Sequence, residues 1–430
     1  MVFAIAAPMT LAYLTTPILG LVDTGVVGQF GDAALIGGLA VGAVVFDIVY
    51  SAFNLVAGMS GFVARAFGAD DRAEQQAVYW RSVVIALSLG LLLLVLAVPV
   101  REAGVWLMNP GAGVAEAARQ YIGIRLLAAP ATMLNYANIG LLLGQGRALA
   151  ALGLQTVLNG INIALSIWLG LGLGWAISGV AWGTVIAEYV AALAGFAIIV
   201  SGFDRSHAPG LARILDRHAM LTMIAVNRDV MIRTMALLGA FALFTRFGAR
   251  LGAVTLAGNA ILMNFFMIAG YYLDGFAVAA EQICGRAIGA RFEPAFWRAV
   301  RLSALWGFLL AVATTLAVLA FGGFGIDLLA RDEAVRAAAK AHLFWAAITA
   351  TTGVLAFLMD GVFVGASLSR DMRNTTILAF ATFAVTAWAL MPALGNLALW
   401  IALNAFLLVR GLSLAALLPR RARSVFSPTG

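Results

Sequence analysis

Residues 64–70 read ARAFGAD and residues 285–291 read GRAIGAR, so one short pattern occurs twice, 221 residues apart. The same offset relates LNYANIGLLLG at 134–144 to LAFLMDGVFVG at 355–365, which share a leucine and two glycines. The offset holds without a gap across more than a hundred residues of each half. The chain is therefore predicted to contain two copies of one structural unit.

The composition is that of a membrane protein. Of the 430 residues 63% are hydrophobic and 11% are charged, and the mean hydropathy is +0.98. Apolar runs of about 20 residues indicate spanning helices, whereas barrel strands would alternate apolar and polar residues. We predict an all-α polytopic membrane protein of about twelve spans, which begin near residues 2, 33, 78, 121, 150, 177, 222, 254, 300, 341, 375 and 398.

The basic residues predict the orientation. The net charge is +7, and Lys340 is the one basic residue of 27 that is not arginine. With the first residue in the cytoplasm, fifteen basic residues fall in inside loops and seven in outside loops, as the positive-inside rule requires. Both termini are therefore expected in the cytoplasm, and the charge needs no nucleic-acid partner to explain it.

The chain is expected to divide at a polar linker. Residues 201–218 read SGFDRSHAPGLARILDRH and separate an amino-terminal lobe of six spans (1–200) from a carboxy-terminal lobe of six (219–419). Residues 420–430 form a cytoplasmic tail. Because six is even, the copies are parallel repeats, related by an axis along the membrane normal. Two such copies in an apolar chain predict a transporter with its path between them.

Cysteine usage and the first residues set further expectations. Cys284 is the one cysteine, so an internal disulfide and a cysteine-based metal site are excluded. The first apolar run lasts to about Val27 and lacks a basic start, so no cleavable signal peptide is expected. No metal and no cofactor are expected, apart from a coupling ion.

Six acidic residues fall within predicted spans. A charge at the bilayer centre costs about 3 kcal/mol or more, so such residues face the bundle interior and often mark ion or proton routes. Structural hydrogen bonds and misplaced span ends are the alternatives. The six are Asp23, Asp47, Glu188, Asp274, Glu281 and Asp360.

Asp23 has the most informative surroundings, PILGLVDTGVVG at 17–28. Pro17 cannot donate to the helix ladder, so a bend of the first helix is predicted beside the acid. Apolar surroundings disfavour the charged form of a carboxylate, which suits Asp23 to loading and releasing a proton. Helical spacing places candidate polar partners on the fifth and sixth spans: Asn159, Asn162, Ser166, Thr184 and Glu188.

At this point the motifs resemble the multidrug and toxic compound extrusion (MATE) transporters, specifically their DinF-like branch. The matching stretches fall in order over nearly the whole chain. They are PILGLVDTGVVGQFG, GFVARAFGADD, YIGIRLLAAPATMLNYANIGLLLGQGRA, LNGINIAL with GLGWAISGVAWGTVIAEY, NRDVMIRT, YYLDGFAVAAEQICGRAIGAR and LMDGVFVGASLSRDMRN.

The resemblance implies two pseudo-symmetric six-helix lobes around a V-shaped cleft. It implies export of cationic or amphipathic compounds, driven by inward proton or sodium flow. The family's cation site falls on Asp23, Asn162 and Thr184, while Ser166 stands where many members carry a second aspartate. Because hard cations prefer several charged oxygens, this departure favours protons over sodium.

The second half supplies a further candidate proton or substrate site. Asp274, Glu281 and Asp360 match places where DinF-like members are acidic, and Asn259 is grouped with them.

The hypothesis is a monomeric antiporter of a bacterial inner membrane that exports drug-like small molecules. Protonation of Asp23 would release Asn162 and Thr184, let the first helix bend near Pro17 and expel the drug. Coupling arises because drug and proton favour different states.

Three other functions remain open on the sequence. A flippase for lipid-linked substrates would need a cationic groove, for which Arg125 and Arg233 are the main in-span candidates. An intramembrane enzyme would need a catalytic constellation, and neither an HExxH motif nor a mid-span histidine occurs, so we expect no enzyme. The buried acids and the repeat argue against a receptor or an assembly protein, which needs neither.

The two copies differ at the in-span acids of the candidate sites. Asp23 is replaced by Phe244, Glu188 by Val409, Asp274 by Phe53, Glu281 by Ser60 and Asp360 by Ile139. The copies agree on glycines and loop arginines, which build and orient the scaffold. The repeat therefore predicts a symmetric frame whose halves carry different chemistry.

Overall fold

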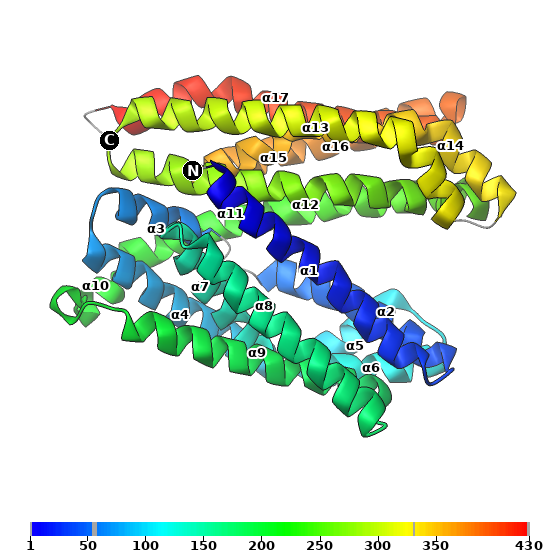
Figure 1. Ribbon diagram of the computed structural model, residues 1–430, viewed down its shortest axis with the longest axis horizontal. Helices are drawn as coiled ribbons and strands as arrows, with labels where there is room; N and C mark the ends of the chain where they lie inside the picture. The colour runs from blue at the N-terminus through cyan, green and yellow to red at the C-terminus, as the bar shows by residue number, and fades with distance from the viewer. Residues whose placement is uncertain (1, 54–57, 330–331, 428–430) are drawn as a thin grey trace. The chain divides into compact units, whose positions relative to one another are not determined.

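The computed structural model describes residues 2–53, 58–329 and 332–427; at residues 14–17, 33, 52–53 and 253 it describes the backbone alone. Within these ranges the chain consists of helices joined by short loops (Figure 1). The helices are α1 (Val2–Gly28), α2 (Ala33–Phe53), α3 (Met59–Gly68), α4 (Arg72–Val95), α5 (Ala97–Met108), α6 (Ala112–Leu126), α7 (Ala129–Gly144), α8 (Ala148–Leu165), the π-helix η1 (Ser166–Gly172), α9 (Ala176–Ser201), the 3-10 turn η2 (Arg205–His207), α10 (Leu211–Ile214), α11 (Arg217–Arg250), α12 (Ala253–Gly289), α13 (Glu293–Leu329), α14 (Glu333–Ala347), α15 (Thr349–Gly365), α16 (Ser369–Leu394) and α17 (Asn396–Phe426).

The predicted all-α membrane fold is confirmed. Within the described ranges, ten spans are long and apolar enough to cross a bilayer, and up to twelve if each bent pair of helices forms one span. The bent pairs are α6 with α7, at 55°, and α14 with α15, at 44°. Every predicted span start falls in one of these spans except the start near residue 33, which lies one residue before the span Ala34–Ser51. Many large side chains at the surface are apolar, as expected for helices that face lipid: Val95, Phe324 and Trp388 are 79%, 74% and 76% exposed.

The repeat is visible in the helix boundaries. A shift of 221 residues carries the bounds of α6 onto those of α14, and the ends of α3 and α7 onto the ends of α12 and α15. The loop residues with positive φ recur at the same offset. The pairs are Gly31 with Gly252, Asp70 with Arg291, Gly146 with Ser367, and Gly174 with Gly395. The two copies therefore share these turns and several of their helix ends.

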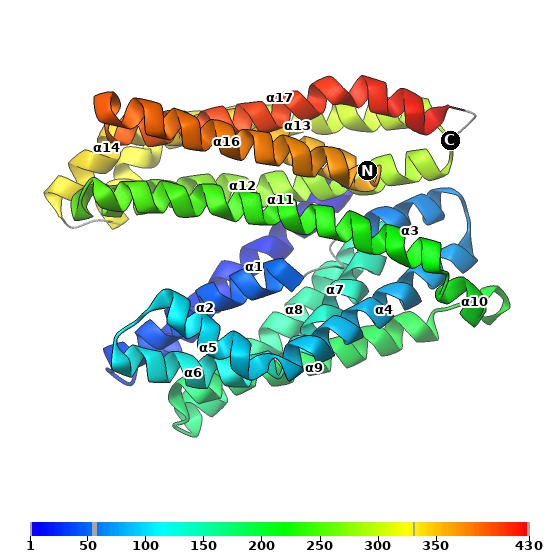
Figure 2. The same cartoon turned by 180° about the vertical axis from the view of Figure 1, so that it is seen from behind.

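The contacts divide the chain into two units, Leu11–Met231 and Met1–Thr10 with Ile232–Gly430. In the first unit α7 packs against both α4 and α9. In the second, α16 and α17 run side by side (Figure 2), and α15 packs against α12 and α17. The lobe boundaries at residues 200 and 219 and the tail at 420–430 stay predictions.

The predicted linker is ordered by charged residues at the start of α4. Arg213 donates to Asp71 Oδ2 (2.9 Å) and Glu74 Oε2 (3.0 Å), and Arg81 donates to Glu74 Oε1 (2.7 Å) and to the carbonyl of Arg213 (2.7 Å). Within the linker, hydrogen bonds from Ser206 and then His207 lower the pKa of Asp204 to about 2, so this carboxylate is ionised at physiological pH.

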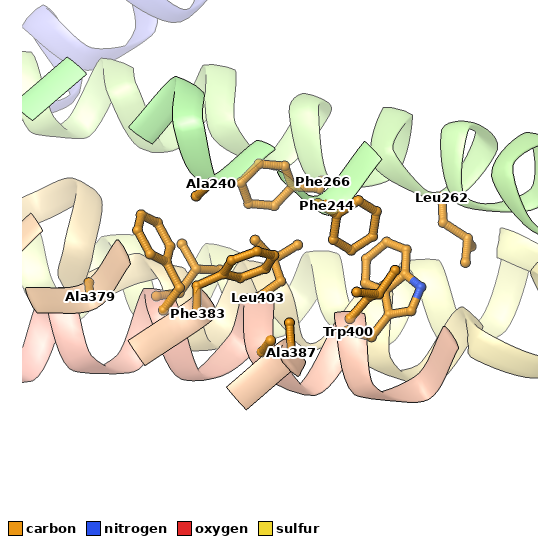
Figure 3. Close-up of a cluster of buried hydrophobic side chains, with 14 of the residues drawn as sticks. Ala240, Phe244, Leu262, Phe266, Ala379, Phe383, Ala387, Trp400 and Leu403 are labelled. Carbon is orange, nitrogen blue, oxygen red and sulfur yellow. The ribbon is translucent and has the colours of Figure 1, made fainter. Parts of the chain in front are cut away.

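An aromatic core fills the second unit. Phe244 of α11 meets Trp400 of α17 edge-on, with ring centroids 5.1 Å apart. Phe266, Phe383 and Leu403 extend the same cluster (Figure 3). These side chains are almost fully buried. Close packing of this kind supplies van der Waals contact between helices that lipid would otherwise separate.

Glycines let the helices approach closely. A β-carbon at Gly144 of α7 would lie 2.7 Å from the carbonyl oxygen of Ser60, and at Gly361 or Gly365 of α15 it would overlap a carbonyl group of α12. Gly140 is the exception among the four repeat-related glycines, because its β-carbon would lie 3.4 Å from Met59 Sδ, an ordinary contact. Equivalent glycines therefore carry different packing constraints in the two copies.

We expect Gly361→Ala to lower the thermal midpoint of the detergent-purified protein clearly, because overpacking against backbone costs about 1–3 kcal/mol or more. Gly140→Ala is the matched control at the same repeat position and should leave the midpoint nearly unchanged. Equal midpoints for the two variants in a thermal unfolding assay would contradict this packing.

Candidate functional site

Three predicted residues meet in the first unit. The Ser166 hydroxyl oxygen lies 3.0 Å from Asp23 Oδ1 and 3.0 Å from Asn162 Oδ1. Asp23 comes from α1, Asn162 from α8, and Ser166 is the first residue of η1. Asp23 is 7% exposed, and the other two are fully buried. The structure thus brings an acid of α1 together with a hydroxyl and an amide that lie 143 and 139 residues further along the chain.

Close backbone contacts fix the position of Ser166. A β-carbon at Gly183 of α9 would lie 2.8 Å from the Ser166 nitrogen, so this helix presses directly on the π-helical turn. One turn away, a β-carbon at Gly179 would lie 2.5 Å from the Gly170 nitrogen, and one at Gly170 would lie 2.5 Å from Val26 Cγ1 of α1. Short π-helical segments are frequent at functional sites. Here the turn is held between α1 and α9.

The other predicted partners on these helices bond elsewhere. Thr184 is buried and follows Gly183, but its hydroxyl donates to the Val180 carbonyl of its own helix at 3.0 Å. Asn159 accepts a hydrogen bond from Gln155 at 3.2 Å. Glu188 accepts a 2.6 Å hydrogen bond from Asn135 of α7. Glu188 therefore belongs to a second polar cluster.

Arg125 of α6 lies at the centre of that second cluster. Its guanidinium is 4.8 Å from the centre of the Phe46 ring, and it acts electrostatically on Asp23, Asp47 and Glu188. Asp47 itself is exposed. The first unit therefore places one arginine among three acids, which is an excess of negative charge when all are ionised.

The predicted bend at Pro17 falls on residues 14–17, whose side chains lie outside the described ones. The backbone of α1 is helical from Val2 to Gly28. The bend stays a prediction.

In the second unit, Asp360 of α15 is engaged by two arginines. Arg233 of α11 and Arg410 of α17 both donate to Asp360 Oδ2. Asp274 of α12 is exposed and acts electrostatically on all three groups. Arg410 was missing from the sequence prediction, which counted acids within spans. Its signal was an arginine inside the apolar run FLLVRGLSLAALL at 406–418.

The remaining predicted residues of the second half lie in other surroundings. Asn259 is buried, exchanges hydrogen bonds with Asn396 at 2.6 and 2.9 Å, and accepts one from Trp400 at 3.0 Å. It therefore fixes the start of α17. Glu281 is half-buried, and its carbonyl faces Gly365.

The repeat provides an internal comparison for the polar site. The positions of Asp23, Asn162 and Ser166 correspond to Phe244, Phe383 and Ala387, which belong to the aromatic core of the second unit (Figure 3). In the second copy, apolar side chains thus pack at the three positions that carry polar residues in the first copy. The polar residues of the first copy are not needed for the frame, which supports a functional role.

Comparison with known proteins agrees with this architecture. A model of the MatE family matches residues 8–168 and 230–389, one segment in each copy. The chain belongs to the MatE family. It is 36% identical over 426 residues to DNA damage-inducible protein F of Escherichia coli, covering 98% of this chain and 92% of that protein. It is also 26% identical to the chloroplastic protein DETOXIFICATION 44 of Arabidopsis thaliana, covering 95% and 80% of the two chains.

Solved structures show the same fold. A multidrug resistance MATE family transporter in an outward-facing conformation matches with a TM-score of 0.89 at 18% identity, covering 99% of this chain and 96% of that one. A MOP superfamily transporter from Pyrococcus furiosus matches with the same TM-score, identity and coverage. This MatE-family chain is accordingly a multi-pass membrane transporter and not an enzyme.

The contact between α9 and η1 gives a test of how the MatE site is built. Gly183→Ala places a methyl group 2.8 Å from the Ser166 backbone, so we expect it to displace the hydroxyl from Asp23 and lower transport several-fold. Gly160→Ala is the control, because a β-carbon there meets no atom within 4 Å. Transport by the two variants, normalised to protein amount, decides the point; equal rates would show that this contact does not position the site.

Proposed function

We propose that this MatE-family transporter is a proton-coupled multidrug antiporter, which exports cationic and amphipathic compounds with Asp23 as its main coupling group. One similar structure is of a multidrug resistance transporter, which supports multidrug export. The 36% identical relative is from E. coli, which supports a bacterial membrane as the location. A bacterial inner membrane and cytoplasmic termini are part of the proposal, and the arginine distribution supports that orientation.

The observation that carries the proposal is the position of the Ser166 hydroxyl between two acceptors. Asp23 Oδ1 and Asn162 Oδ1 are each 3.0 Å from its oxygen, yet a hydroxyl has a single hydrogen to donate. Both bonds can form together only if one of the neighbours supplies a hydrogen. The hydrogen-bond direction at Ser166 must therefore depend on the protonation of Asp23 or on the orientation of the Asn162 amide.

Two arrangements satisfy this chain of groups. When Asp23 is protonated, it donates to Ser166, and Ser166 donates to Asn162 Oδ1. When Asp23 is ionised, Ser166 donates to the carboxylate, and Asn162 must turn its amide to donate to Ser166. In the present orientation Asn162 Nδ2 is buried without a hydrogen-bond partner among the described residues, so turning the amide replaces the bond from Ser166 to Oδ1 by one from Nδ2 to Ser166 and breaks no bond of Nδ2. Loading a proton on Asp23 would thus reverse the hydrogen bonds joining α1, η1 and α8.

The oxygen atoms at the site suit a proton better than a sodium ion. Asp23 contributes the single carboxylate, with one serine hydroxyl and one amide oxygen beside it. Hard cations favour sites with several oxygen ligands, and charged ones bind them most strongly. A proton needs one carboxylate oxygen and one acceptor, and Ser166 supplies the acceptor.

Coupling follows if the two hydrogen-bond arrangements favour different transporter states. A hydrogen bond to a charged group contributes about 1.5–3 kcal/mol, which is comparable to typical coupling energies of about 1–3 kcal/mol. The proton gradient then biases one state, and the drug biases the other. The substrate would be expelled from the state in which Asp23 holds the proton.

Asp23→Asn is the first test of this function. The variant keeps the shape of the side chain but cannot exchange a proton, so we expect proton-driven efflux of a fluorescent cation from proteoliposomes to fall at least about tenfold. Asp47→Asn is the matched control, since Asp47 is an in-span acid with an exposed side chain. Unchanged proton-driven efflux by Asp23→Asn would remove Asp23 from the mechanism.

Ser166→Asp tests the choice of ion. The substitution adds a second carboxylate beside Asp23 and so restores the acid that the resemblance places there. We expect a sodium gradient to drive efflux by this variant. The same gradient should drive no efflux by the unaltered protein. Sodium-driven efflux by the unaltered protein would contradict proton coupling; a variant that responds to neither ion, although folded, would contradict the assignment of this pocket.

A lipid flippase is the alternative. It requires cationic groups for a phosphate, and the second unit does contain two arginines close together. Reconstitution with a fluorescent phospholipid and, separately, a fluorescent cation distinguishes the two functions.

A further inference from the structure

The contacts of Arg233, Asp360 and Arg410 carry an inference beyond proton coupling. Both guanidinium groups contact the same oxygen, Asp360 Oδ2. Two positive charges thus share one negative charge within helices that span the membrane. The cluster of these three side chains, called here the arginine cluster, has an excess positive charge.

Glycines beside two of the charged residues bring α15 close to α12 and to α17. Gly361 follows Asp360 and meets the backbone of Ala277 on α12, while Gly411 follows Arg410 and would place a β-carbon 2.7 Å from the Ala356 nitrogen of α15. The Phe357 ring of α15 lies 5.9 Å from the Arg410 guanidinium. Arg410 of α17 is 2% exposed, so its side chain is buried against α15.

The donors of the arginine cluster exceed its acceptors. Arg410 Nε and Nη1 and Arg233 Nε are buried without a hydrogen-bond partner among the described residues, although each guanidinium carries five N–H groups. Asp360 Oδ1 is also buried and unpartnered. A salt bridge that served stability alone would need one arginine, and unsatisfied buried donors cost free energy. The geometry is better matched to a second anionic group.

Asp274 is the nearby acid that could neutralise the excess, but it lies differently from Asp360. Its side chain is exposed, and its influence on Arg233 and Arg410 is electrostatic. The Arg233 side chain retains 18% exposure. An acid group from outside the helix bundle can therefore approach Arg233 and take the place of Asp274 as the counter-charge.

The repeat argues against a structural need for these charges. The positions of Arg233, Asp360 and Arg410 correspond in the first copy to Ala12, Ile139 and Tyr189, all uncharged. The frame thus folds without the arginine cluster, just as the second copy folds without the polar residues around Ser166.

We propose that the arginine cluster binds the anionic group of an amphipathic molecule, a carboxylate or a phosphate. Arg233 makes the first contact, and Arg410 fixes the position of Arg233 through Asp360. The physiological meaning rests on the proposed export function: acidic and zwitterionic amphipaths join the substrate class. A fixed guanidinium pair recognises such groups through charge-assisted hydrogen bonds.

The test measures binding without any ion gradient, so its outcome is independent of Asp23. The full chain in phosphatidylcholine nanodiscs is titrated with dansyl-labelled undecanoic acid and, as an uncharged control, with its methyl ester. We expect the acid to bind at least about tenfold more tightly than the ester, the order expected for a charge-assisted hydrogen bond. Asp23→Asn should show the same preference, which separates this proposal from proton coupling.

Variants assign the preference to the arginine cluster. Arg233→Gln should abolish the preference for the acid, while Arg246→Gln, an exposed arginine on the same helix α11, should retain it. Asp274→Asn removes a competing acid from an exposed position and should tighten binding of the acid several-fold. The Asp274→Asn variant tests the proposal even if Arg233→Gln does not fold.

A second experiment, with lipid, distinguishes the two sources of the anionic group. Native mass spectrometry of protein taken from nanodiscs that contain phosphatidylglycerol reports retained lipid. Retention that depends on Arg233 assigns the site to a lipid phosphate, and a preference for the fatty acid alone assigns it to a soluble carboxylate. Equal binding of acid and ester by both the unaltered protein and Asp274→Asn, with lipid retention independent of Arg233, would overturn the proposal.

Discussion

A charge inside the membrane has to be matched by a partner within the protein, and this constraint governs the polar contacts of both units. The cost of an unmatched charge, about 3 kcal/mol or more, is comparable to the gain from several good packing contacts. In the first unit Asp23 is matched by a serine hydroxyl and by the more distant Arg125. In the second, Asp360 is matched directly by two arginines. Asp23 thus has a neutral hydrogen-bond partner, whereas Asp360 has two cationic ones.

The repeat separates the features that both copies share from those that only one copy carries. Helix ends and left-handed loop residues recur at the 221-residue offset, because every copy of the unit must make the same turns. The charged and polar side chains of the two candidate sites do not recur at this offset. Phe244 and Phe383 pack where Asp23 and Asn162 lie in the first copy, and Ala12 and Ile139 occupy the positions of Arg233 and Asp360. Each copy therefore serves as evidence that the other's charges are dispensable for folding.

Much of this could be predicted from the sequence, for identifiable reasons. Span number follows from apolar length, and the meeting of Asn162 with Ser166 follows from their spacing of four along one predicted span, where α8 continues into η1. The pairing of Arg410 with Asp360 could not be predicted, because it joins helices 50 residues apart and one sequence contains no signal for that contact. Helical spacing also placed Thr184 and Glu188 on one face. It could not show that one would bond to its own backbone and the other to Asn135.

Close packing determines whether a change of charge at Asp23 has consequences beyond the site. If Ser166 lay on a loose segment, protonation of Asp23 would be absorbed by a local shift of one side chain. Instead, Gly183 and Gly179 bring α9 against the backbone of η1, and Gly170 brings η1 against Val26 of α1. Tightly packed elements move together or rearrange to another packed state, since interiors have little free volume. The hydrogen-bond reversal that we propose at Ser166 would therefore act on α1, α8 and α9 as a group, as a coupling site in a transporter requires.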